Sequence, residues 1–347
     1  MQKHGLYRVV SRRVESVQVR SSQVKGCFMI EHGSEEWHAA RKGRVTSSVA
    51  AAVLGLDPDM TPLQAWMSIT GRERFDGNKA TVRGTVLEPV VLDYPTLGGE
   101  LKRTPARFVG PEGAWWGDSS DCLYHGDDLF VGEGKTVAQG LVGRWGDDGT
   151  DEVPDKVLVQ SLWHLHAWPE TRACIVPVLF GGYKFEFRQY SVERDADLIG
   201  DIVERCERWH RDHVVADRPP EATAGDDDGL KYLWPKHVPD KWIDPTSELA
   251  QLVAEYIDAR DAAKQAESAK KSASARLRQI LGDAEGSRGM DDSGAPFKVT
   301  HKLQSGKLVT NWEAIARELG ATDQDIQRHT GSGEGCRVLR CTRPKKG

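Results

Sequence analysis

The sequence predicts an α/β or α+β fold with one main core and a smaller C-terminal extension. Helical and strand patterns of apolar residues alternate within residues 29–224, and such interleaving is typical of helices packed on a sheet. The chain has 347 residues, and a chain of about 300 residues buries enough surface to form a core without disulfides or structural metals. The six cysteines form no C-x-x-C pair and no zinc spacing, which predicts free thiols in a reducing compartment.

Three segments of the chain differ in composition. Residues 1–28 are basic, with Glu15 as their one acid, and three interpretations stay open: a disordered arm that touches DNA, a transit peptide, or an upstream extension of the reading frame before Met29. Residues 29–224 are expected to form the core. The acidic Gly-Asp-Asp-Asp-Gly run at 225–229 marks the start of the extension, residues 225–347, which is expected to hold a long helix or helical hairpin and then a small α/β unit.

Capping residues and glycines delimit the first helices of the core. Short helices are expected at Val49–Leu54, from Thr61-Pro62 to Gly71, and from Gly84-Thr85 onward. Pro89 fits the last of these because proline is tolerated near the first turn of a helix.

The remaining elements follow from the spacing of apolar residues. Strands are expected at Ala106–Val109, Trp115–Tyr124, Leu129–Val137, Ile175–Phe180 and Lys184–Val192, and helices at Lys156–Trp168 and Asp195–His213. The extension is expected to contain a helix at Ser247–Leu281, a strand near Phe297–Leu303, a helix at Trp312–Leu319 and a strand at Cys336–Cys341.

Charge and hydropathy narrow the choice of partners. The formal net charge of −5 argues weakly against a nucleic-acid partner, but an enzyme can line one channel with Arg and Lys while its other surfaces stay acidic. No apolar run approaches the roughly 18 residues of a membrane helix. The sequence therefore predicts a soluble, cytoplasmic protein.

Two acidic residues and a lysine are predicted to meet on one face of a hairpin. The segment His125–Asp128 has turn chemistry, and a hairpin centred on Asp127 places Asp121 directly across from Glu133. Cross-strand Cβ atoms lie about 4.5–5.5 Å apart, and like charges there are destabilising unless a cation lies between them. Side chains alternate along a strand, so Glu133 and Lys135 share a face.

The chemistry of this cluster suits Mg²⁺, with Mn²⁺ as a substitute. Mg²⁺ uses one or two carboxylates and keeps several waters, which leaves room for a phosphate. The ion lowers the pKa of a bound water and stabilises developing charge, while Lys135 can orient or deprotonate the nucleophile. Glu88 can add a third carboxylate from the neighbouring helix, directly or through water.

Two other interpretations compete with a metal site. Glu-x-Lys on a strand, taken alone, is usually a solvated face with a weak ion pair. Glu133-Gly134-Lys135-Thr136 also looks like the end of a phosphate-binding loop. However, Leu129 stands where that loop requires its first glycine, so nucleotide binding is excluded.

An ordered series of short motifs favours the metal site. The series comprises Arg41–Ser48, Leu54-Gly55, Thr61-Pro62-Leu63 with Trp66 and Thr70-Gly71, Gly84 with Leu87-Glu88-Pro89, Ser120-Asp121, Glu133-Gly134-Lys135, and Gln160 with Leu165. In order and spacing it resembles the YqaJ-like viral recombinase family, the lambda-exonuclease branch of the PD-(D/E)XK nucleases, over about residues 29–220. The resemblance implies a restriction-endonuclease-like core, in which helices flank a central mixed sheet.

The resemblance also implies the roles of individual residues. It implies Mg²⁺ ligands at Glu88, Asp121, Glu133 and the Gly134 carbonyl, a catalytic Lys135, Gln160 at the edge of the site, and Arg41 with Ser48 on a terminal 5′-phosphate. Physical chemistry supports the last pair, since a helix start attracts anions and an arginine can clamp a phosphate. A plain helix cap at Ser48 is an equal alternative.

The implied function is a magnesium-dependent exonuclease of phage-type recombination. Such an enzyme digests linear double-stranded DNA from 5′ to 3′ and leaves a single strand for an annealing protein, and the family implies a homo-oligomer in the form of a ring-like trimer. Another repair or defence nuclease is one alternative. A DNA-binding or assembly protein that has lost catalysis is the other, but it should lack a catalytic side chain, and all of them are present.

Two residues depart from the family pattern. Cys122 stands where a glycine usually follows the aspartate, and Gly134 stands where an apolar residue usually separates the glutamate and lysine. Neither change removes a ligand. Gly134 is expected to loosen its strand, since glycine weakens strand interiors.

Four other residues are expected to be structural. Trp115 and Trp116 are predicted to belong to the core or its rim. His164 and His166 lie two apart on a predicted helix, a poor geometry for a shared metal, and are predicted to be packed or surface histidines.

Overall fold

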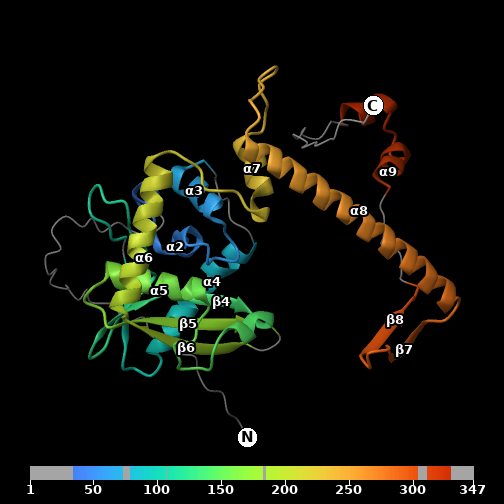
Figure 1. Ribbon diagram of the computed structural model, residues 1–347. Coiled ribbons are helices and arrows are strands. Elements are labelled where there is room, and N and C mark those ends of the chain that lie inside the picture. The colour runs from blue at the N-terminus through green and yellow to red at the C-terminus, as the bar shows by residue number, and fades with distance from the viewer. Residues whose placement is uncertain (1–33, 73–78, 107, 183–184, 304–310, 330–347) are drawn as a thin grey trace, which may run out of the picture. The chain divides into compact units, whose positions relative to one another are not determined.

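The structure is a computed structural model that describes residues 34–72, 79–106, 108–182, 185–303 and 311–329 (Figure 1). The chain divides into two compact units, one ending at Leu233 and the other beginning at Trp234, and each unit is described by itself. The predicted arm at residues 1–28 and the predicted strand Cys336–Cys341 lie outside the described residues.

The first unit is built on a mixed six-stranded sheet, which confirms the predicted α/β fold class. Its strands are β1 (Lys102–Pro105), β2 (Cys122–His125), β3 (Leu129–Gly132), β4 (Lys135–Ala138), β5 (Ala173–Gly181) and β6 (Glu186–Glu193). Antiparallel pairs join β1 to β2, β2 to β3 and β5 to β6, whereas β3 and β4 both run parallel to β5. The long and almost fully buried β5 is therefore the centre of the sheet.

Helices cover both faces of this sheet (Figure 1). The helices and helical turns of the first unit are α1 (Glu35–Arg41), α2 (Ser47–Val53), α3 (Pro62–Thr70), α4 (Lys79–Asp93), η1 (Tyr94–Thr96), η2 (Gln139–Arg144), α5 (Asp155–Ala167), α6 (Ala196–Trp209), η3 (His210–Val215), η4 (Ala224–Asp226) and α7 (Asp227–Leu233). Cys174 and Val176 of β5 pack in one core with residues of α2, α5 and α6, whereas Ile175 packs with Leu92 of α4 in another. Alternate side chains of one strand thus face the two helical layers.

Local chemistry explains where the predicted helices begin and end. Thr61 accepts a hydrogen bond from the backbone of Gln64, whose side chain accepts one from the backbone of Thr61, so α3 begins with a capping box. Gly71 ends this helix at a φ of 70°, and Gly55 follows α2 at a φ of 74°, a region that favours glycine. The predictions for these two helices are confirmed.

The predicted start of α4 is wrong. The helix begins at Lys79 rather than at Gly84, so Pro89 lies inside it and not in its first turn. A proline there removes one backbone hydrogen bond. The burial of Val91 and Leu92 against the sheet outweighs that loss, which is why the helix continues to Asp93.

Two predicted strands are shorter or displaced. The strand expected at Ala106–Val109 lies at Lys102–Pro105, and of Trp115–Tyr124 only the end from Cys122 joins the sheet. Between these strands the described backbone pairs through isolated bridges, one of which joins Val109 to Asp118. The glycine-rich sequence of this segment explains the irregularity, since glycine weakens strand interiors.

The strand predicted at Leu129–Val137 is interrupted at Glu133 and Gly134. The pieces on either side, β3 and β4, keep one register against β5, so the chain leaves the sheet only locally. A Cβ on Gly134 would lie 3.0 Å from Leu92 Cδ2. The glycine therefore allows α4 to approach the strand closely at the point where Glu133 stands.

The second unit contains a long helix and a small hairpin. Its elements are α8 (Ser247–Leu281), β7 (Gly286–Met290), β8 (Pro296–Thr300), α9 (Trp312–Glu318) and α10 (Asp323–Arg328). The strands β7 and β8 pair antiparallel, and α8 has the predicted bounds. None of the helices in the described part of the chain combines the length and apolar character needed to cross a membrane.

Candidate active site

Asp121 and Glu133 face each other one residue beyond the last pair of the β2–β3 ladder. That last pair is Cys122 with Gly132, and the Asp121 backbone N–H donates to the Gly132 carbonyl at 3.2 Å. Asp121 Oδ2 also accepts a hydrogen bond from the Gly134 backbone at 2.8 Å. The register predicted for this hairpin is confirmed, and it brings both carboxylates to the strand break.

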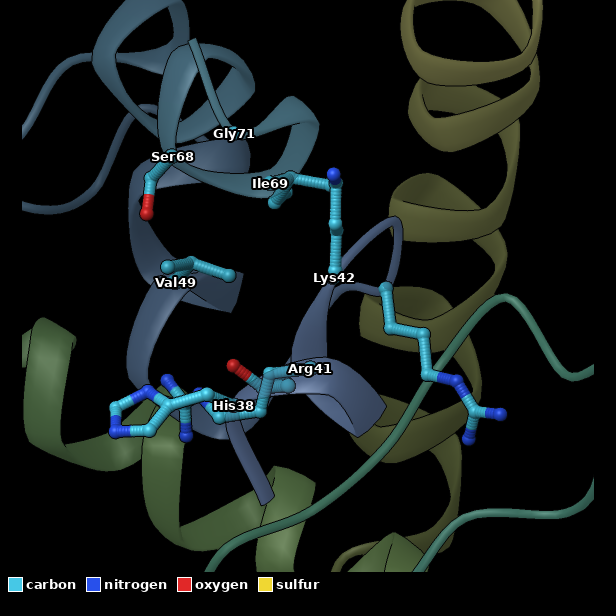
Figure 2. Close-up of a pocket in the computed structure, with 9 residues that line it drawn as sticks. His38, Arg41, Lys42, Val49, Ser68, Ile69 and Gly71 are labelled. Carbon is cyan, nitrogen blue, oxygen red and sulfur yellow. The ribbon is translucent and has the colours of Figure 1, made fainter. Parts of the chain in front are cut away.

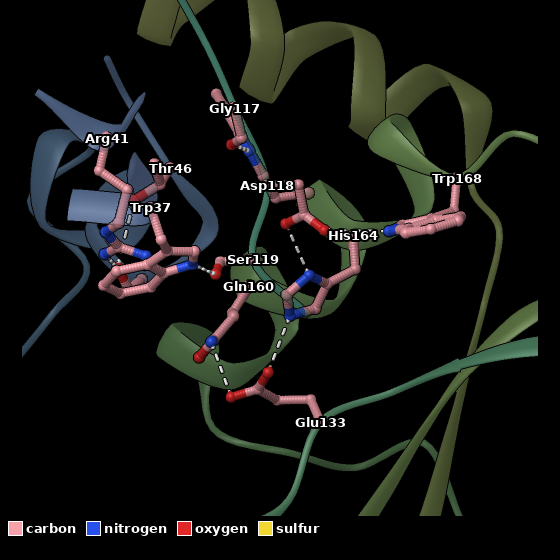
Figure 3. A network of polar contacts seen from close by, with 12 residues as sticks. Trp37, Arg41, Thr46, Gly117, Asp118, Ser119, Glu133, Gln160, His164 and Trp168 are labelled. Carbon is pink, nitrogen blue, oxygen red and sulfur yellow. Dashed lines mark hydrogen bonds and ion pairs between the residues drawn. The ribbon is translucent and has the colours of Figure 1, made fainter. Parts of the chain in front are cut away.

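Three side chains hold the carboxylate of Glu133, and Figure 3 shows two of them, Gln160 and His164. Lys135 Nζ donates to Oε1 at 2.7 Å, and Gln160 Nε2 donates to the same oxygen at 2.8 Å. His164 Nε2 lies 3.0 Å from Oε2. Gln160 and His164 lie one turn apart on α5, so they share a face of that helix. The structure therefore brings together Glu133, Lys135 and Gln160, three of the residues selected from the sequence.

The electrostatics of Glu133 and Lys135 favour an ion pair. Burial alone raises the pKa of Glu133, but the Lys135 ammonium and the His164 hydrogen bond outweigh it and lower that pKa to about 2. Burial alone lowers the pKa of Lys135, but the charge of Glu133 outweighs it and raises that pKa. At neutral pH Glu133 is thus a carboxylate and Lys135 an ammonium.

Asp121 lies in the opposite environment. Its pKa is raised well above the ordinary value, first by burial and then by the negative charges of Glu133 and Glu88. Glu88 on α4 therefore belongs to the same electrostatic cluster. The two neighbouring carboxylates therefore make the ionised form of Asp121 costly, and a divalent cation beside Asp121 would reduce that cost.

Two residues of this site, Asp121 and Glu133, could hold a cation that needs few protein ligands. Within the described residues, no group of three or more His, Cys, Asp or Glu side chains is placed to hold a metal ion. Mg²⁺ needs only one or two carboxylates and completes its shell with water. Asp121 and Glu133 are the residues that could supply these carboxylates.

Sequence reasoning missed two residues of this site, Asp118 and His164. His164 is packed, as expected, but its Nδ1 lies 2.7 Å from Asp118 Oδ1 while its Nε2 faces Glu133. Burial alone lowers the pKa of His164, but Asp118 and then Glu133 outweigh it and raise that pKa to about 10. The available signal was the position of His164, four residues after Gln160 on one helix.

The other residues expected to be structural, His166, Trp115 and Trp116, pack against neighbouring side chains. His166 is partly buried, its ring centroid lies 4.8 Å from that of Trp116, and burial lowers its pKa. Trp115 and Trp116 pack against the main core, which confirms their predicted place. Cys122, like the other described cysteines, is a buried free thiol.

Arg41 lines a separate basic pocket of about 260 Å³ (Figure 2). The basic side chains that line the pocket are His38, Arg41, Lys42 and Arg44. Arg41 donates from Nη2 to Ser48 Oγ at 2.7 Å, so the structure brings together the predicted phosphate-binding pair. The helix that follows, α2, has only seven residues, and the positive character of the pocket therefore comes from its side chains.

Trp37 connects Arg41 of this pocket to Ser119. The Arg41 guanidinium lies 4.3 Å from the centroid of the Trp37 ring, a distance at which the cation and the ring attract each other. The Trp37 indole N–H donates to Ser119 Oγ at 2.7 Å, and Ser119 follows Asp118 in the chain. Figure 3 shows these groups beside the network around Glu133.

The structure defines an α/β protein whose mixed sheet is flanked by helices. Its candidate site gathers carboxylates and a lysine at a strand break. Residues 36–168 match the family model of the YqaJ-like viral recombinase domain. The matched segment holds the whole cluster described above. This segment of the chain is therefore similar to the YqaJ-like viral recombinase domain, the family that the sequence motifs resemble.

The chain is also similar to individual proteins. The chain is 25% identical over 262 residues to the uncharacterized protein YqaJ of Bacillus subtilis (strain 168), which covers 74% of this chain and 80% of that protein. Among solved structures, it is similar to an alkaline exonuclease from Laribacter hongkongensis, at 22% identity and a TM-score of 0.41, over 53% of this chain and 94% of that one. A SOX–DNA complex matches at 9% identity and a TM-score of 0.32, over 57% and 68% of the two chains.

Proposed function

We propose that this chain is a metal-dependent DNA nuclease that digests linear duplex DNA from its ends during recombination. The observation that carries the proposal is the contact of Lys135 Nζ with Glu133 Oε1 at 2.7 Å, with Asp121 facing Glu133 across the hairpin. The recombinase-domain match at residues 36–168 supports DNA as the substrate. A purely structural Glu-x-Lys pair would not require further buried carboxylates beside it.

Asp121 and Glu133 would hold Mg²⁺, with Mn²⁺ as a substitute, and Glu88 would approach the ion from α4. The hydrogen bond from the Gly134 backbone N–H to Asp121 holds residue 134 beside the carboxylates, and its carbonyl, in the following peptide unit, is the proposed backbone ligand. The bound ion would supply a coordinated water of lowered pKa and stabilise negative charge on the phosphate.

Lys135 would orient the attacking water and neutralise charge on the scissile phosphate. Its raised pKa makes it a poor proton acceptor at neutral pH, so the proposed role is electrostatic. Gln160 accepts a hydrogen bond from Lys135 Nζ and donates one to Glu133 Oε1, both at 2.8 Å. It would therefore hold the two groups in a fixed relation while DNA binds.

The basic pocket beside Arg41 would receive the terminal 5′-phosphate. A guanidinium and several neighbouring cations suit a phosphate dianion, and Ser48 adds a hydroxyl within reach of the same group. Binding of that end would make digestion proceed from 5′ to 3′. It would leave a 3′ single strand, the form of DNA that a single-strand annealing protein binds.

The test is digestion of a linear duplex whose two strands carry different end labels. We expect Mg²⁺ to support release of nucleotides from the 5′-phosphorylated strand, with no release in chelator and none from a covalently closed circle. Digestion that continues in chelator would exclude the metal mechanism. A stable complex with DNA ends that is never cleaved under any divalent cation would instead identify a binding protein.

We predict that Arg41→Ala selectively slows digestion of ends that carry a 5′-phosphate. A lost charge-assisted contact costs about 1.5–3 kcal/mol, or roughly ten- to a hundredfold in rate if it acts in the transition state. The measurement is the ratio of rates on phosphorylated and hydroxyl ends, in the wild type and the variant.

Arg72→Ala is the matched control for this prediction. Arg72 also lies 4.3 Å from a tryptophan centroid, that of Trp66, and it forms an ion pair with Asp217, but it does not line the basic pocket. Its loss should leave the ratio of rates unchanged. An equal change of the ratio in both variants would show that Arg41 does not read the phosphate.

A further inference from the structure

His164 and Asp118 form a buried chain of contacts that ends at the Glu133 carboxylate, and the reaction proposed above assigns neither of them a role. Asp118 Oδ1 lies 2.7 Å from His164 Nδ1, and His164 Nε2 lies 3.0 Å from Glu133 Oε2. All three residues are buried. We propose that His164, held by Asp118, is a positioning residue that fixes the Glu133 carboxylate in the orientation that binds the catalytic metal.

Asp118 is anchored in the core independently of the active site. Its backbone N–H donates to the Val109 carbonyl at 2.7 Å, and its own carbonyl accepts from Val109 at 2.9 Å. Its side-chain Oδ2 accepts a hydrogen bond from the Trp168 indole at 3.2 Å. The preceding Gly117 carbonyl accepts one from the Trp163 indole at 2.9 Å. The position of Asp118 is therefore fixed by the core, and its contact with His164 fixes the position of the imidazole ring in turn.

His164 connects this anchor to Glu133 and is not itself available to a metal. Each ring nitrogen faces a carboxylate oxygen, and a carboxylate accepts hydrogen bonds but does not donate them. Both nitrogens are therefore occupied, Nδ1 by Asp118 at 2.7 Å and Nε2 by Glu133 at 3.0 Å. A metal ligand needs a free nitrogen lone pair, so the role left to His164 is to hold Glu133.

Glu133 needs such support because its strand is interrupted at that point. The residue lies between β3 and β4, and its backbone N–H donates to the Ile175 carbonyl at 3.1 Å. Its flexible side chain is held instead from α5, where Gln160 contacts Oε1 and His164 contacts Oε2. Two residues on one face of α5 thus hold the two oxygens of the carboxylate, one oxygen per residue. The carboxylate therefore has little freedom to rotate.

The experiment measures Mn²⁺ binding to the full chain without DNA, by calorimetric titration or by the electron paramagnetic resonance signal of free Mn²⁺. His164→Asn places an amide nitrogen where Nδ1 was and removes the contact to Glu133. His164→Gln places one where Nε2 was and can retain that contact. His166→Asn is the matched control, since it changes a partly buried histidine of the same helix that does not touch Glu133.

We expect His164→Asn to weaken Mn²⁺ binding by about 10- to 100-fold, the usual effect of removing a group that orients a metal ligand. His164→Gln should lose less, and His166→Asn should bind Mn²⁺ as the wild type does. A purely structural role would lower the fraction of folded protein but leave the Mn²⁺ affinity of the folded fraction unchanged. That result, in His164→Asn, would overturn the proposal.

A second variant keeps the test valid if His164→Asn does not fold. Asp118→Asn preserves the shape of the side chain but weakens its hold on His164, and about tenfold weaker Mn²⁺ binding is expected. Wild-type affinity in Asp118→Asn would likewise overturn the positioning role. The inference rests on the proposed function, but the two can fail separately. A wild-type chain that binds no Mn²⁺ would overturn the metal-dependent mechanism, whereas wild-type affinity in the variants would overturn only the role of His164.

Discussion

Lys135→Ala is expected to reduce the rate of DNA digestion by at least about a hundredfold, and on the order of a thousandfold if the ammonium stabilises the transition state directly. The variant removes the positive charge next to Glu133 and leaves Gln160 without the group it accepts from. Glu133→Ala should be at least as severe, because it removes a proposed metal ligand and the partner of Lys135 together. The measurement is the single-turnover rate on end-labelled duplex at saturating Mg²⁺.

Lys156→Ala provides the control for the Lys135 variant. Lys156 is also paired with carboxylates, Asp57 at 3.0 Å and Asp59 at 3.2 Å, but it stands at the start of α5 and does not contact Glu133. Its loss should leave the rate unchanged. Circular dichroism and binding to DNA ends establish that each variant is folded. A folded Lys135→Ala that digests DNA at the wild-type rate would remove Lys135 from the mechanism.

The parts of the fold that depend on local chemistry could be predicted from the sequence. The start of α3 at Thr61 and its end at Gly71 follow from one capping box and one left-handed glycine. The register of Asp121 against Glu133 follows from a short turn of known centre, since turn length sets the pairing of a hairpin. These features require no knowledge of distant residues.

The parts that depend on packing between distant segments could not be predicted. The contact between Asp118 and His164 joins residues 46 positions apart, and no spacing rule connects them. The early start of α4 has the same origin. The burial of Leu92 against the sheet stabilises the helix more than Pro89, which favours the first turn of a helix, destabilises it. The break at Gly134 was anticipated only as a weakness of the strand, since its cause is the approach of another helix.

The candidate site was predicted to the extent that its motifs lie on neighbouring strands. Glu133 and Lys135 follow from alternation along one strand, and their direct contact at 2.7 Å was within reach of that rule. The orientation of the Glu133 carboxylate was not, because α5 sets it through Gln160 and His164. The motif at Gln160 pointed to helix α5, but α5 also contributes His164 to the site, which the motif did not indicate.

Trp163→Ala is expected to lower the free energy of unfolding of the first unit by about 3–5 kcal/mol, the usual cost of replacing a buried tryptophan by alanine. The Trp163 side chain is fully buried, and its ring packs edge-on against Trp115 with centroids 6.0 Å apart. Its indole N–H donates to the Gly117 carbonyl at 2.9 Å, so the variant leaves both a cavity and an unpaired carbonyl. Since whole domains are stable by about 5–15 kcal/mol, this is a large fraction of the total.

The change is measured by pulse proteolysis of the full chain over a range of urea concentrations, which reports the unfolding of the first unit from the loss of its protected fragment. With a slope of about 1–3 kcal/mol per molar urea, the midpoint should fall by at least about 1 M. Trp163→Phe should lose less, because it keeps one buried ring and leaves a smaller cavity, although it too gives up the indole hydrogen bond. Trp242→Ala, at a side chain that is 91% exposed, should stay within about 0.5 kcal/mol of the wild type. Equal midpoints for Trp163→Ala and Trp242→Ala would show that Trp163 does not support the core. They would also show that Trp163 does not support the position of Asp118.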